Sequence, residues 1–191
     1  MKDLEIRGAG ELLGANQHGH MNSVGFDLYC EIIREEIEAL KGNEPEKEIN
    51  VVINLPVSAY IPKNFIKNEN DRINLYKSLS EANDIKDIGI LLSKITERFG
   101  DLPDVLNNLF NISRIKLLLK KKSIESIRYI PGKGVIIKPV IISKDKAFKL
   151  NRKNKNLSYN FRDKSIIISF LNSKLDLDVL FVILKDIVNN I

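Results

Sequence analysis

Four glycines around one arginine and one glutamine form the first feature of this sequence that could bind a ligand. The stretch "DLEIRGAGELLGANQHGH" begins at Asp3 and contains Gly8, Gly10, Gly14 and Gly19. A dinucleotide fingerprint needs G-x-G-x-x-G after a strand, but Leu13 stands where the third glycine belongs. A P-loop needs G-x-x-x-x-G-K-[ST], and the sequence contains no such string. We therefore expect glycine turns around a short helix here, and no phosphate-binding loop.

Other residue types that carry catalytic or metal chemistry are sparse. His18 and His20 form an H-x-H pair, but a zinc site needs further ligands, and Cys30 is the only cysteine. The serines lie in no nucleophile-elbow motif, and no pair of carboxylates stands apart from the many on helix faces. We therefore expect no catalytic residue, no metal ion and no bound cofactor in this chain.

Arg7 and Gln17 are the polar side chains that the glycine turns would present. Arginine offers a rigid fork of donors to a carboxylate or phosphate, and glutamine both donates and accepts, so the pair could contact a moving partner. Alternatively, Arg7 pairs with a nearby carboxylate (Asp3, Glu5 or Glu11) in a surface salt bridge that contributes about 0 to 1 kcal/mol. The residues alone leave both interpretations open.

Charge is distributed unevenly along the 191 residues. Residues 1–100 carry 12 Lys and Arg against 17 Asp and Glu, whereas residues 101–191 carry 18 against 8. The basic second part could form a nucleic-acid surface. Alternatively, a general enrichment of the sequence in Lys, Asn and Ile would give the same charge count, and the lysines would then form an ordinary solvated surface. The lone cysteine and the lack of a signal peptide or membrane-spanning run indicate a cytoplasmic protein that contacts no membrane.

Hydrophobic spacing predicts an α+β fold. An amphipathic helix ends at Gly42, and the polar residues 43–48 form a linker. A β-like run over 49–57 precedes three helical patterns. Asp101 can cap the third helix. The buried stripe of that helix consists of Val105, Leu109, Ile112, Ile115 and Leu119. Short β-branched runs follow at 124–130, 134–142, 157–161 and 165–170, with turns at 131–134 and 151–155, before a final helix over 175–191. Helices followed by short strands favour a mainly antiparallel sheet over a βαβ repeat.

Several stretches resemble one known family. "DLEIRGAGELLG", Gln17, "GH" at Gly19 and His20, and "VGFDLYCEII" are similar to the translocation motif of bacterial transcription-repair coupling factors, which RecG-type branch-migrating helicases share. "LPVSAYIPKNFI", "NDRINLYKSLSEAND", "ITERFGDLPDVLNNLF" and "ISRIKLLLKK" resemble the C-terminal domain of the same factors. The resemblance is specific to about residue 120 and looser beyond.

The resemblance implies a C-terminal fragment of an ATP-dependent translocase on double-stranded DNA that displaces stalled RNA polymerase and recruits nucleotide excision repair. Arg7 and Gln17 match the motif's coupling arginine and glutamine, with Gly8, Gly10, Gly14 and Gly19 at its turns. Residues 1–42 would be a truncated translocation motif with its connecting helix, and residues 49–191 an autoinhibitory regulatory domain. That domain would pack on the motor domains and on the N-terminal region that binds UvrA.

The resemblance also implies that ATP and Mg²⁺ belong to the parent motor, because this chain has neither a nucleotide-binding loop nor an acidic box. The chain is therefore not expected to be an enzyme by itself. A RecG-type helicase fragment, a free-standing basic nucleic-acid-binding module and an inactive remnant are the alternatives.

Overall fold

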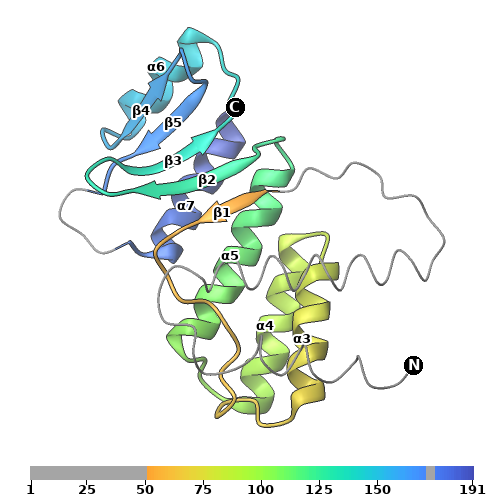
Figure 1. The fold of residues 1–191 in the computed structure, drawn as a ribbon. Helices are drawn as coiled ribbons and strands as arrows, with labels where there is room; N and C mark the ends of the chain where they lie inside the picture. Colours follow the sequence, from red (N-terminus) through yellow and green to blue (C-terminus); the bar gives the residue numbers. More distant parts are fainter. Residues whose placement is uncertain (1–50, 171–174) are drawn as a thin grey trace, which may run out of the picture.

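A computed structural model describes residues 51–170 and 175–191, and element labels follow Figure 1. The described elements, in chain order, are β1 (Val52–Asn54), α3 (Glu69–Glu81), α4 (Ile85–Phe99), α5 (Asp104–Lys120), β2 (Ser126–Ile130), β3 (Gly134–Lys138), α6 (Lys144–Lys153), β4 (Leu157–Asn160), β5 (Ser165–Ile168) and α7 (Leu177–Asn190). This arrangement confirms the predicted α+β class. The amphipathic helix ending at Gly42 and the linker 43–48 lie outside the described residues.

The strands form one mixed sheet in the order β1-β2-β3-β5-β4. β1 runs parallel to β2, and the remaining neighbours are antiparallel. The parallel pair is joined through α3, α4 and α5, and its ladder is extended by the Val52 N–H, which donates to the Glu125 carbonyl at 2.8 Å. The β2–β3 hairpin turns at residues 131–133, as the "PGKG" string predicts.

Successive residues of each strand point to opposite faces, so that the sheet has a core face and an outer face. The paired register brings buried isoleucines together on the core face: Ile53, Ile127, Ile137 and Ile166 occupy adjacent positions across four strands. Figure 1 shows α5 and α7 together on one side of the sheet, with α3 and α4 further along α5 and α6 beside β4. Packing between α5 and α7 and between α6 and β4 agrees with this view.

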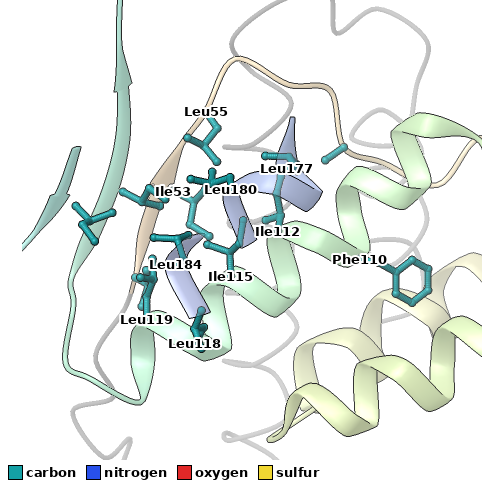
Figure 2. Close-up of a cluster of buried hydrophobic side chains, with 14 of the residues drawn as sticks. Ile53, Leu55, Phe110, Ile112, Ile115, Leu118, Leu119, Leu177, Leu180 and Leu184 are labelled. Carbon is teal, nitrogen blue, oxygen red and sulfur yellow. The ribbon is translucent and has the colours of Figure 1, made fainter. Parts of the chain in front are cut away.

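Helix α5 is the centre of the core because it is buried on both sides. The predicted buried stripe is confirmed for four of its five residues, whereas Val105 is half-buried. The four buried residues are Leu109, Ile112, Ile115 and Leu119. Figure 2 shows α5 and α7 side chains meeting Ile53 and Leu55, whereas Phe110 lies on the side of α5 toward the other helices. The predicted Asp101 cap is wrong, since α5 begins at Asp104 and Pro103 occupies the N-cap position without a side-chain hydrogen bond.

Helix α6 is the largest departure from the sequence expectation. The prediction of a turn over 151–155 is wrong in part, because Asn151, Arg152 and Lys153 form the last turn of α6. Ser143 caps the helix by accepting from the Lys146 N–H at 3.3 Å. The helix buries only Ala147 and Leu150, which is too short an apolar pattern to be recognised without the sheet that covers it.

Helix α4 begins with a reciprocal cap. The Asp84 side chain accepts from the Ile85 N–H, while Asp87 accepts from the Asp84 N–H at 3.0 Å. The pKa of Asp84 lies below its ordinary value, first because of the Ile85 N–H bond and next because Lys121 lies 3.4 Å from its carboxylate. The same carboxylate therefore starts α4 and contacts the residue after α5.

Candidate interaction surfaces

The predicted site residues Arg7 and Gln17, and the turn glycines Gly8, Gly10, Gly14 and Gly19, lie outside the described residues. The same holds for His18, His20 and Cys30. Their roles therefore stay predictions. Among residues 51–170 and 175–191, no group of three or more His, Cys, Asp or Glu side chains could hold a metal ion. In the same ranges no helix is both long and apolar enough to span a membrane.

The family-like stretch "AYIPKNFI" is held in place by α3. The Arg72 guanidinium is buried, and its Nη1 donates to the carbonyls of Ile66 and Lys67, each at 2.9 Å. The Tyr76 hydroxyl accepts from the Ile61 N–H at 3.0 Å. These side chains satisfy backbone groups of a buried irregular segment. Arg72 and Tyr76, which belong to the family-like stretch "NDRINLYKSLSEAND", therefore have a structural role.

A polar cluster fixes the final helix against α5. The fully buried Asn111 donates to the Asp178 carboxylate at 2.9 Å, and Asn107 reaches the other oxygen at 3.4 Å. Arg114 in turn donates to the Asn111 side-chain oxygen at 3.3 Å. The hydrophobic pattern did not predict this cluster, although an asparagine in the middle of an apolar helical run is the signal that could have indicated it. Buried polar groups need partners, and so the cluster sets where α7 docks.

The outer face of the sheet is the first candidate interaction surface. One row of paired residues crosses the strands in the sequence Asn54, Arg128, Ile136, Ile167 and Ser158. Val52 and Ile130 lie on the same face and are 47% and 38% exposed. Arg128 is exposed, while Ile136 and Ile167 are half-buried. An apolar patch with a central arginine has the composition of a protein-binding surface.

A second surface combines α6 with the turn between β4 and β5. All eight lysines and arginines from Lys144 to Lys164 are exposed. This stretch contains only two acidic residues, Asp145 and Asp163. Lys153 forms an ion pair with Asp186 of α7. This stretch contributes eight of the 18 lysines and arginines in the second part of the chain.

The described residues thus form an α+β domain with a five-stranded mixed sheet and two candidate interaction surfaces. A family model described as "TRCF domain" matches residues 55–147. The transcription-repair-coupling factor of Bacillus subtilis is 37% identical over 129 residues, and that of Borreliella burgdorferi is 33% identical over 183 residues. These matches cover 67% and 90% of this chain but only 11% and 16% of the relatives, so that the chain spans a small part of their length.

A solved structure described as "Crystal structure of C-terminal domain of transcription-repair coupling factor" has the same fold. Its TM-score is 0.62 at 20% sequence identity, with 75% of this chain and 94% of that chain covered. Residues 55–147 thus belong to the C-terminal TRCF domain of a transcription-repair coupling factor (Mfd). The match favours this family over the RecG-type alternative.

Proposed function

We propose that this chain acts as the C-terminal part of a transcription-repair coupling factor, with residues 49–191 as its regulatory domain. The match to the TRCF domain carries the proposal. In the parent protein, an ATP-dependent motor translocates on double-stranded DNA in the cytoplasm, displaces stalled RNA polymerase and recruits nucleotide excision repair. ATP and Mg²⁺ bind to that motor. The regulatory domain restrains the motor and covers the surface that binds UvrA.

The outer sheet face suits the intramolecular contact that such restraint requires. Val52 and Ile130 provide exposed apolar area, and Arg128 offers a charge between them. Arginine and apolar groups are favoured at the buried centre of protein interfaces. We propose that this face docks on the parent's N-terminal UvrA-binding region. A contact that covers one partner's binding surface lowers the partner's affinity for anything else that binds there.

The first prediction concerns Arg128. In an intact parent protein, Arg128→Glu should loosen the docked state and raise the affinity for UvrA by about tenfold or more, because central interface arginines contribute heavily to binding. Isothermal titration calorimetry with UvrA measures the change. Lys94→Glu on α4 makes the same charge change at another exposed position and should leave the affinity unaltered. Equal affinities in the two variants would contradict docking through this face.

We also propose that Arg7 and Gln17 couple ATP hydrolysis to movement along the duplex. Their place in the glycine-rich motif supports this role, since the turns would present both side chains to neighbouring motor and DNA surfaces. An arginine can follow a phosphate or carboxylate through a conformational change because its charge and fork geometry are fixed.

The second prediction tests the coupling residues. In the intact parent, Arg7→Ala should leave ATP hydrolysis measurable but abolish translocation, which a triplex-displacement assay records. Arg34→Ala serves as the control, because it removes an arginine from the charged face of the following helical pattern. Wild-type translocation by the Arg7→Ala protein would rule out the coupling role.

A further inference from the structure

The surface of α6 and the β4–β5 turn is strongly basic. Residues 144–164 carry a net charge of +6, whereas α7 carries one lysine against Asp178 and Asp186. Apart from Lys153, which pairs with Asp186, none of the basic side chains of this stretch forms an ion pair within the described residues. A polyanion is the partner that such a surface would attract.

Exposed aromatic rings distinguish this surface from an ordinary lysine-rich one. Phe148 on α6 is 70% exposed and Phe161 in the turn is 51% exposed. The other phenylalanines in the described ranges are buried or half-buried: Phe65, Phe99, Phe110, Phe170 and Phe181. The ring of Phe161 stands edge-on to Tyr159, with 4.7 Å between centroids. A general enrichment in lysine would not expose two phenylalanines on the same basic stretch.

Hydrogen bonds join the segment before α6 to β4 and the β4–β5 turn. The Val140 N–H donates to the Lys164 carbonyl at 2.7 Å, and the Tyr159 hydroxyl donates to the Val140 carbonyl at 2.7 Å. The chain entering α6 is thereby fastened to the β4–β5 turn. Figure 1 shows α6 lying beside β4, in agreement with their packing.

Along α6, a ring stands between two cations. Lys144, Phe148 and Arg152 follow one another at four-residue intervals and therefore lie on one side of the helix, about 6 Å apart along its axis. Each of the three is exposed. The arrangement offers a stacking platform flanked by positive charge, which is how proteins bind unpaired nucleotides.

We propose that α6 and the β4–β5 turn bind single-stranded nucleic acid, with phosphates on the lysines and arginines and bases against Phe148 and Phe161. A duplex hides its base faces, so that exposed rings favour a single strand. This activity goes beyond the proposed regulatory role, in which DNA is bound by the parent motor, and it does not depend on that role.

The charge contribution can be tested with the full 191-residue chain and a fluorescent oligothymidylate of about 20 nucleotides, longer than most sites of this kind. Lys144→Gln/Lys149→Gln/Arg152→Gln should weaken binding about tenfold or more at low salt. It should also reduce the slope of log Kd against log salt by about 2, since each phosphate contact contributes about 0.7. The matched triple Lys63→Gln/Lys67→Gln/Lys94→Gln removes equal charge from exposed positions near α3 and on α4 and should bind like the unaltered chain. Equal loss in both triples, or no salt-sensitive binding by the unaltered chain, would overturn the proposal.

The stacking contribution needs its own variants. Phe148→Ala should weaken binding about fivefold or more, whereas Phe148→Trp should preserve it. The chain has no tryptophan, so the introduced indole reports alone, and oligothymidylate should quench its emission. Ile90→Trp on α4, another exposed position, should show no quenching. Tighter binding of a duplex, or equally effective competition by polyglutamate, would overturn the assignment to single strands.

Discussion

Replacing Gly134 with alanine is expected to lower the free energy of unfolding by about 2 to 5 kcal/mol. Gly134 has φ +104°, where a side chain is strained, and a Cβ there would lie 2.2 Å from the Ile168 carbonyl oxygen. The next nearest atom is the Cα of Ser169 at 3.0 Å. Both neighbours belong to backbone, so that only separation of β3 from β5 relieves the clash. Urea denaturation followed by circular dichroism measures the loss.

Gly132 provides the matched control for Gly134. It lies in the same hairpin with φ +75°, but a Cβ there would meet no atom within 4 Å. Gly132→Ala should therefore cost only the backbone strain, about 1 kcal/mol. If the two alanine variants lost the same stability, the close approach of β5 to Gly134 would not be what requires glycine.

Replacing Phe110 with alanine should destabilise the chain by about 3 to 5 kcal/mol, the usual cost of emptying an aromatic site in a core. Phe110 is 0% exposed and lies on the side of α5 away from α7, as Figure 2 shows. Its removal should loosen α3 and α4 from α5. Thermal and urea unfolding give the stability, and hydrogen exchange of α4 amides gives the local effect.

Phe148→Ala controls for the loss of a phenylalanine ring itself. That ring is largely exposed, so its removal should change stability by no more than about 0.5 kcal/mol. The same unfolding measurements also show whether the Phe148→Ala protein is folded, which is required for interpreting its nucleic-acid binding. A loss at Phe148 as large as that at Phe110 would mean that α6 packs against the domain differently from the structure.

Hydrophobic spacing predicted most of the elements because their burial patterns are local. The stripe on α5 and the β-branched runs of β2, β3 and β5 belong to this group. Spacing showed only one buried face of α5, however, whereas Leu106, Phe110 and Leu118 are buried as well. A helix buried on both sides has no polar stripe to mark the second contact. The parallel pairing of β1 with β2 also depends on contacts far apart in sequence and could not be predicted.

The candidate surfaces could be predicted from the sequence only in part. The charge count indicated a basic second part, but residues 151–155 were predicted as a turn, which hid the helix that carries Phe148 between Lys144 and Arg152. The outer sheet face required the register, because Arg128, Ile136 and Ile167 lie on three different strands. Arg7 and Gln17 came from motif resemblance, and they stay predictions.

The parallel β1–β2 pair has a mechanical consequence. The chain enters the sheet through its three-residue edge strand, which is anchored by the buried side chains of Val51, Ile53 and Leu55. Tension applied to the chain ahead of Val51 therefore falls first on the ladder that joins Val52, Ile53 and Asn54 to β2. Losing that short ladder would open the edge of the sheet while β2 to β5 stay paired. The preceding residues are thus attached to the domain through its shortest strand, which lies at the edge of the sheet.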